Sequence, residues 1–157
     1  MSADLDMTGT WKWTKTQGDT VQFLADQGYS WLTRKLVGGL MKSAYEKTEV
    51  ITMDEKSYKC EEKGAPRNPQ HTQTIDLTIG SGEAKEFVYG ANKKASVSVK
   101  WSERKDRLIF TTSNEDYPKI FFRYVNADGL LVEEMHVLDK KSGKPMTGSL
   151  IQFFKKQ

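Results

Sequence analysis

The 157-residue chain has very little cysteine and histidine. Its one cysteine, Cys60, excludes an intrachain disulfide and fits a reducing compartment. The two histidines, His71 and His136, are far apart, and neither has a cysteine or carboxylate at a spacing typical of metal ligands. Nothing around these three residues resembles a catalytic motif. We therefore expect no metal site and no cofactor.

The chain also lacks an excess of one charge and a long apolar run. Its 24 basic and 21 acidic residues give a net charge of +3, and the lysines are scattered among Asp and Glu. A nucleic-acid-binding protein needs a clustered basic face, so this distribution argues against one. No stretch approaches the roughly 18 apolar residues of a membrane span, and the acidic start of the chain is unlike a secretory signal. These absences predict a cytoplasmic protein.

Short alternating segments make up most of the sequence. Turn residues separate them about every 8–12 positions, which is typical of an antiparallel barrel or sandwich. Hydrophobic residues make up 37% of the chain, enough for the core of a single domain over residues 1–157. We predict ten strands: Thr8–Thr16, Ala44–Met53, Ser57–Lys63, Thr72–Ile79, Ala84–Val88, Lys94–Trp101, Arg107–Thr112, Lys119–Asn126, Leu130–Leu138 and Thr147–Lys155.

Helical periodicity is confined to one region near the N-terminus. Apolar residues recur at helical spacing after Asp19, Gly28 interrupts the pattern, and Gly38-Gly39 ends it. This predicts two short helices, at about Thr20–Asp26 and Tyr29–Val37.

The last predicted strand is apolar on both faces. Leu150, Gln152 and Phe154 alternate with Ser149, Ile151 and Phe153, so each face needs cover from more sheet or from a bound apolar molecule. A buried amide costs about 1–3 kcal/mol unless it is hydrogen-bonded. Gln152 therefore predicts a buried polar partner in the protein, in water or in a ligand.

Four segments of the sequence carry a family resemblance: Gly9-Thr10-Trp11-Lys12, Gly28 with Leu32–Gly38, Phe122–Val125 with Asp128–Leu130, and Gln152–Lys156. In this order they resemble the intracellular lipid-binding proteins, which include the fatty-acid-binding and cellular retinoid-binding proteins. The resemblance implies an all-β fold: a ten-stranded antiparallel clam-like barrel of the calycin or lipocalin type. A short helix-turn-helix lid would cap it, and one hydrophobic molecule would lie inside.

The same resemblance suggests where the polar end of a ligand would bind. The family holds a carboxylate with an arginine on the eighth strand and an Arg-x-Tyr pair on the last. Arg123 resembles the first, while the pair is replaced by Gln152-x-Phe154, which is similar to the retinol-binding branch. Arg123 faces the cavity, or is a surface residue of a strand in another register, or is the structural partner of a nearby glutamate. We predict a ligand site formed by Arg123, Gln152, Phe154, Phe121, Leu32 and Leu36.

These features predict a non-enzymatic, monomeric carrier of one fatty acid, retinoid or similar long apolar molecule. An acid is favoured over an alcohol because a buried, unpaired guanidinium is costly. Two alternatives remain: a luciferase-like oxygenase on the same barrel, and a lipid-loaded membrane-associated or structural protein. In the second helix and its exit, we expect Leu32, Leu36 and Leu40 to face the cavity mouth. Arg34, Lys35 and Lys42 would face solvent or make transient contact with anionic membranes.

Overall fold

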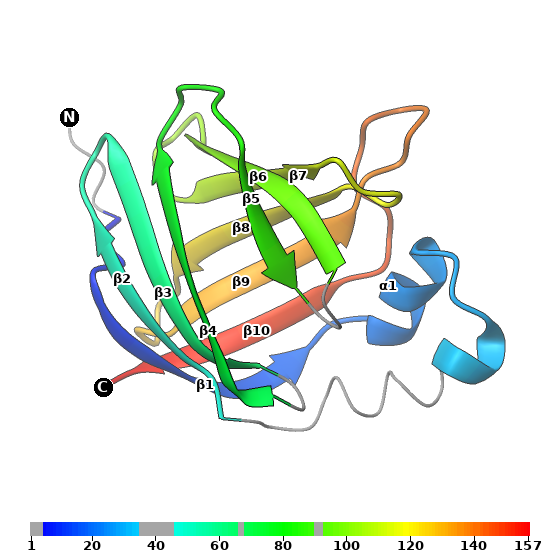
Figure 1. Cartoon of the computed structure of the whole chain (residues 1–157), viewed down its shortest axis with the longest axis horizontal. Coiled ribbons are helices and arrows are strands. Elements are labelled where there is room, and N and C mark those ends of the chain that lie inside the picture. The colour runs from blue at the N-terminus through cyan, green and yellow to red at the C-terminus, as the bar shows by residue number, and fades with distance from the viewer. Residues whose placement is uncertain (1–4, 35–45, 66–67, 90–92) are drawn as a thin grey trace.

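The computed structural model describes residues 5–34, 46–65, 68–89 and 93–157. Its ten strands are β1 Gly9–Gln17, β2 Thr48–Met53, β3 Ser57–Ala65, β4 Asn68–Thr78, β5 Lys85–Tyr89, β6 Lys93–Trp101, β7 Leu108–Ser113, β8 Lys119–Val125, β9 Leu131–Val137 and β10 Leu150–Lys156. They form one antiparallel sheet in the order β4-β3-β2-β1-β10-β9-β8-β7-β6-β5. Figure 1 shows this sheet wrapped around an interior, with helix α1 (Thr20–Asp26) at one end.

The two edge strands, β4 and β5, are joined by a side chain. The amide of Gln73 on β4 donates from Nε2 to the carbonyl oxygen of Val88 on β5 (2.7 Å), and Oε1 of Gln73 accepts from the backbone N–H of Val88 (3.0 Å). This amide makes the pair of bonds that a backbone peptide makes in a ladder. It helps to hold the sheet as a nearly closed barrel, so the predicted ten-stranded fold is confirmed.

Helix α1 has the bounds that the sequence predicts, because Asp19 caps it. The Asp19 carboxylate accepts a hydrogen bond from the backbone N–H of Gln22 at 3.0 Å. Gly28 follows the helix with a φ of +78°, a conformation that glycine adopts without strain. Helical geometry resumes at residues 31–34, and the rest of the predicted second helix lies outside the described residues.

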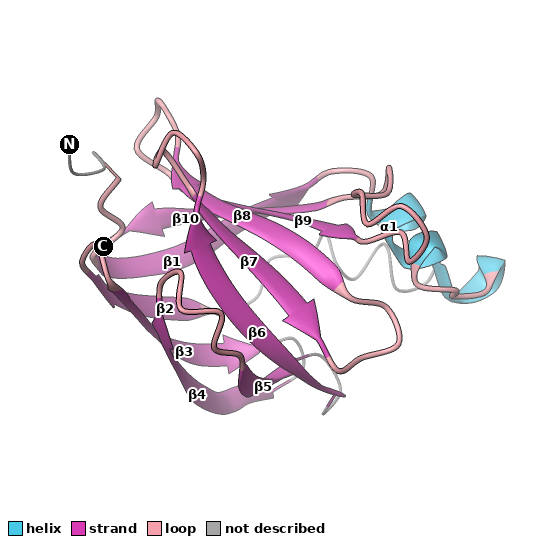
Figure 2. Ribbon diagram, turned by 90° about the horizontal axis from the view of Figure 1, so that it is seen from above, coloured by secondary structure: helices cyan, strands magenta, loops and turns pink. Residues whose placement is uncertain are grey.

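Helix α1 is anchored to the segment that precedes β10. The Asp26 carboxylate accepts from the backbone N–H of Gly148 at 2.8 Å, and the backbone N–H of Ser149 donates to the Asp19 carbonyl at 3.1 Å. Figure 2 shows α1 beside the barrel end at which β9 ends. A β-carbon at position 148 would lie only 2.2 Å from the backbone nitrogen of Phe23, so the close approach requires glycine.

We expect Gly148→Ala to loosen α1 and lower the free energy of unfolding by about 1–3 kcal/mol, the usual cost of overpacking. The added methyl group must push the Phe23 backbone away and strain the bond from Gly148 to Asp26. Urea unfolding measures the loss, and amide hydrogen exchange locates it in α1. Lys141→Ala, at an exposed position of the same connection, is the control. Unchanged exchange in α1 would contradict this account of Gly148.

Several predicted strand bounds are wrong. The strands that start at Thr48 and Leu150 begin later than predicted, and between the predicted ends Lys63 and Thr72 the sequence indicates a loop with Pro66 and Pro69, but β3 extends to Ala65 and β4 begins at Asn68. Proline cannot donate to a ladder, yet it is tolerated in β4 because this strand lies at an edge of the sheet. The pairing is irregular between Lys63 and Ala65, where the register shifts.

The interior is packed unevenly. Away from α1, many inward side chains are at most 2% exposed, as for Ile51, Leu77, Leu108 and Leu131, while Met53, Trp101 and Val125 are partly buried. Trp11, Trp13 and Cys60 belong to this core and are 2–3% exposed.

Nearer α1, the inward apolar side chains of Phe87, Met135 and Leu150 remain partly exposed. The Lys93 ammonium, at the start of β6, donates to the hydroxyl of Tyr29 at 3.0 Å. Because Tyr29 follows α1, the start of β6 also lies at the α1 end of the barrel. Solvent therefore reaches inward-facing apolar side chains at the α1 end of the barrel. Within the described part of the chain, no helix combines the length and the apolar character that a bilayer-spanning segment needs.

Candidate functional site

Arg123 lies on the inner face of β8, and every N–H of its guanidinium group has a protein acceptor. Nε and one terminal nitrogen donate to Oε2 of Glu133, the former at 2.7 Å. The two terminal nitrogens bind the Glu49 carboxylate in a fork, at 2.6 and 2.9 Å, and one of them also donates to the Tyr58 hydroxyl at 3.0 Å. A guanidinium has five N–H donors, so none is left over.

The strands bring these groups together from opposite sides of the barrel. Glu133 on β9 stands directly opposite Arg123 in the β8–β9 register, whereas Glu49 and Tyr58 come from β2 and β3. Arg123 is 3% exposed, Glu49 0% and Glu133 7%, so the cluster is shielded from solvent. The alternative of Arg123 as the partner of a glutamate is therefore the one found, on the inner face of the sheet.

Charge pairing outweighs the cost of burial in this cluster. Burial alone would raise the pKa of the Glu49 carboxyl, but the positive charges of Arg123 and Lys47 lower it from 4.5 to about 2. Burial would likewise lower the pKa of Arg123, and the carboxylates of Glu133 and Glu49 raise it well above its ordinary value. Burial raises the pKa of Tyr58. The cluster is thus a buried ion network in which the Glu49 carboxylate is ionised around neutral pH.

The network continues from Glu49 toward β4. The Lys47 ammonium lies 3.2 Å from Oε1 of Glu49 and 3.8 Å from Oε1 of Glu62, and Nε2 of His71 lies 3.9 Å from Oε2 of Glu62. Together with Arg123 and Glu133, the part of the network that the structure describes therefore contains three carboxylates and two permanently basic side chains. His71 adds a positive charge only when it is protonated.

Next to this network lie two polar side chains, those of Gln152 and Thr16, whose hydrogen-bonding groups are not used by the described residues. Gln152 on β10 is directly opposite Glu133 on one side and Thr16 on the other, and it is 8% exposed. Among the described residues, its side-chain amide makes no hydrogen bond, and the buried Thr16 hydroxyl has no partner either. Only Oε2 of Glu133 is bonded to Arg123, so its Oε1 is a further acceptor in this row.

The two predicted phenylalanines flank the network. Phe121 stacks on Phe110 with ring centroids 4.7 Å apart, and Phe154 is completely buried with its ring 5.8 Å from the Arg123 guanidinium carbon. Both belong to the hydrophobic core and provide an apolar wall next to the charged groups.

The predicted lid residues are not brought to this network by the described structure. Leu32 is 62% exposed, and its neighbour Trp31 is 61% exposed. Leu36 lies outside the described residues, as do Leu40, Lys35 and Lys42.

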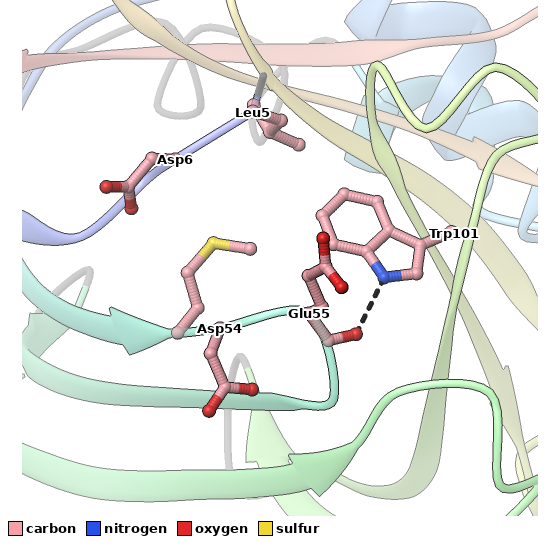
Figure 3. A pocket seen from close by; sticks show the side chains of 6 residues that line it. Leu5, Asp6, Asp54, Glu55 and Trp101 are labelled. Carbon is pink, nitrogen blue, oxygen red and sulfur yellow. Dashed lines mark hydrogen bonds between the residues drawn. The ribbon is translucent and has the colours of Figure 1, made fainter. Parts of the chain in front are cut away.

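A pocket of about 230 Å³ lies apart from this network (Figure 3), lined by Leu5, Asp6, Met53, Asp54, Glu55 and Trp101. Several of its polar groups are already engaged. The Trp101 indole N–H donates to the Glu55 carbonyl at 2.9 Å. Bonds from the backbone N–H of Lys56 and from Ser57 lower the pKa of Asp54, whose carboxylate closes its own turn. We assign no function to this pocket.

No metal site is assigned either, because no group of three or more potential ligands occurs among residues that the structure describes. His136 faces outward, where its Nε2 lies 2.9 Å from Oε2 of Glu134 and its Nδ1 lies 2.9 Å from the Gly148 carbonyl. It belongs to the connection that supports α1.

Sequence reasoning missed the three direct partners of Arg123, which are Glu49, Glu133 and Tyr58, and it also missed Lys47 and Glu62. A signal for the two glutamates was present, because each alternates with apolar inward residues, Glu49 with Ile51 and Glu133 with Leu131. A carboxylate on an apolar face predicts a buried cation. The identity of that cation follows only from the closure of the barrel.

Comparison with known proteins gives structural matches only. A scan against protein-family models and a search of curated proteins each found no match. Fatty-acid-binding proteins are among the similar solved structures. The Schistosoma mansoni protein in complex with arachidonic acid has 16% identity, a TM-score of 0.64 and coverage of 96% of this chain and 95% of its own. Fatty-acid-binding protein 1 of Echinococcus granulosus has 14% identity, a TM-score of 0.64 and 96% coverage of both chains.

A third similar structure, the wild-type fluorescent protein UnaG, has 16% identity and a TM-score of 0.66, with 96% of this chain and 97% of that chain covered. Each match spans nearly the whole length of both chains, and identities this low carry information about the fold alone. Taken with the ten-stranded barrel, its helix at one end and its strand order, they show that this chain has the fold of the fatty-acid-binding proteins.

Proposed function

We propose that this protein is a monomeric, cytoplasmic, non-enzymatic carrier that binds one long apolar molecule inside its barrel. The observation that carries the proposal is the uneven interior. Side chains such as Leu108 and Leu131 are fully buried at one end, while Phe87, Met135 and Leu150 face inward yet stay partly exposed at the end beside α1. Partly exposed apolar side chains inside a small barrel are suited to contact with a ligand.

The nature of the similar structures supports a lipid as the ligand. One of them is described in complex with arachidonic acid, a long-chain fatty acid. Long-chain fatty acids, retinoids and related lipids share an extended apolar body that could replace the solvent around Phe87, Met135 and Leu150. Their burial would contribute roughly 0.8 kcal/mol for each buried methylene group.

Exposed apolar side chains at the α1 end support the proposal of transient membrane contact. Val21 is 46% exposed, and Trp31 and Leu32 are more exposed still. A tryptophan beside a leucine at the surface suits the interface between lipid head groups and acyl chains. The carrier would then exchange its ligand at the end of the barrel where solvent reaches the interior.

Two measurements test the proposal. Mass spectrometry of an organic extract should recover an intact lipid from the purified protein, and a neutral fluorescent dye such as Nile red should bind the delipidated protein at one site. Added myristyl alcohol should displace the dye without consuming oxygen. If the dye does not bind saturably and no lipid is extracted, the carrier function is refuted. Oxygen consumption during lipid binding would instead support an oxygenase.

A further inference from the structure

We propose that the barrel selects a lipid whose head group donates a hydrogen bond and carries no negative charge, such as a hydroxyl, and that it discriminates against carboxylates. This inference rests on the proposed carrier function and specifies its ligand class. It reverses the preference for an acid that the sequence alone favoured. The reason is the arrangement of the groups around Arg123.

The internal carboxylates already occupy the place of a ligand carboxylate. Glu49 and Glu133 occupy the two edges of the guanidinium at which paired N–H groups can bind a carboxylate. Tyr58 accepts from the remaining N–H. A fatty acid could reach these donors only by displacing one of the glutamates. The displaced glutamate would remain buried without its cation, which is strongly unfavourable.

The net charge of the network acts in the same direction. Within the described ranges, Glu49, Glu62 and Glu133 face two permanently basic partners, Arg123 and Lys47. A ligand carboxylate would add a fourth acid to this buried set. Like charges at short range repel strongly where water is excluded, so an ionised head group is disfavoured even without direct displacement.

The open positions beside the network match a hydroxyl. Gln152 offers amide N–H donors that no described residue uses. On the neighbouring strand directly opposite, Oε1 of Glu133 accepts no hydrogen bond from a described residue. Cross-strand neighbours of this kind have β-carbons about 4.5–5.5 Å apart. A hydroxyl can accept from Gln152 and donate to Glu133, and the unpartnered Thr16 hydroxyl lies next in the row. A carboxylate has no proton for Glu133.

Dye displacement at neutral pH tests the inference with a matched pair of lipids, myristyl alcohol and myristic acid. We expect the alcohol to bind about tenfold more tightly or better, because hydrogen bonds to charged groups are of that strength. Equal or tighter binding of the acid would overturn the inference and leave the carrier function standing. If neither lipid displaces the dye, the carrier function fails and the inference fails with it.

Two variants locate the selectivity. Glu133→Gln removes one negative charge and frees part of Arg123, so the acid should gain about tenfold in affinity, whereas the alcohol should bind more weakly because its hydroxyl then donates to a neutral amide oxygen. Glu134→Gln, the same substitution one residue along the strand and on the outer face, is the control and should leave both affinities unchanged. Gln152→Leu should weaken the alcohol about fivefold or more and leave the acid unaffected. An unaltered alcohol-to-acid ratio in folded Glu133→Gln protein contradicts the assignment.

Discussion

Replacing Arg123 by leucine should lower the free energy of unfolding by about 3–5 kcal/mol, the usual cost of removing one member of a buried ion network. The substitution leaves Glu133 buried with no cation among the described residues, and it leaves Glu49 with Lys47 alone. The new leucine contributes apolar contact but cannot compensate two desolvated carboxylates. Urea unfolding followed by tryptophan fluorescence measures the loss.

Two further variants test whether the loss of stability comes from breaking the buried ion network. Arg107→Leu removes an arginine whose side chain is 40% exposed, and it should cost no more than about 1 kcal/mol. Replacing Arg123, Glu49 and Glu133 together by leucine should recover most of the stability, because no unpaired charge then remains between these three positions. If Arg123→Leu is as mild as Arg107→Leu, the network does not stabilise the barrel.

The free energy of unfolding should fall when the pH is lowered from about 4.5 to about 2. The pKa of Glu49 is about 2 in the folded protein against 4.5 ordinarily, so the folded state holds the ionised form more strongly than the unfolded state does. A carboxyl whose pKa is depressed in the folded state contributes its full stabilisation at pH values above its unfolded-state pKa. This stabilisation is lost as the pH falls through the folded-state pKa. The shift corresponds to on the order of 3 kcal/mol.

Glu49→Gln isolates this contribution from that of other acids. The variant should be less stable than the wild type near pH 6, and the difference should shrink steadily as the pH falls below 4.5. Glu61→Gln is the matched control, since the Glu61 side chain is 45% exposed. Unfolding free energies measured in urea at several pH values decide the matter. A difference between wild type and Glu49→Gln that stays constant over this range would contradict the ionised, buried state of Glu49.

Local features of the sequence predicted most of the architecture. Helix α1 was placed at its observed bounds because its signals, the capping Asp19 and the apolar spacing that follows, are local. Strand bounds were set by alternation and turn residues. The start of β4 was misjudged at Pro69 because the consequence of a proline depends on whether its strand lies at an edge, and strand order is not a local property.

The candidate site could be predicted only in part. Alternation correctly placed Arg123 and Gln152 on inward faces, because register is a period-two pattern. The partner Glu49 comes from a strand on another side of the barrel, 74 residues earlier, so its pairing with Arg123 exists only in the closed fold. The charge of the interior depends on such pairings. This is why the sequence favoured an acidic ligand and the geometry favours a neutral one.

Methionine methyl NMR during a lipid titration tests most directly whether the barrel interior holds one ligand. Met135 faces the partly open interior, whereas Met7 is fully buried in the packed core. We predict that the Met135 methyl signal, assigned with Met135→Leu, shifts upon addition of myristyl alcohol and saturates at one equivalent, while the Met7 signal stays nearly in place. No shift of Met135, or shifts that continue to grow far beyond one equivalent, would contradict a single lipid site inside the barrel.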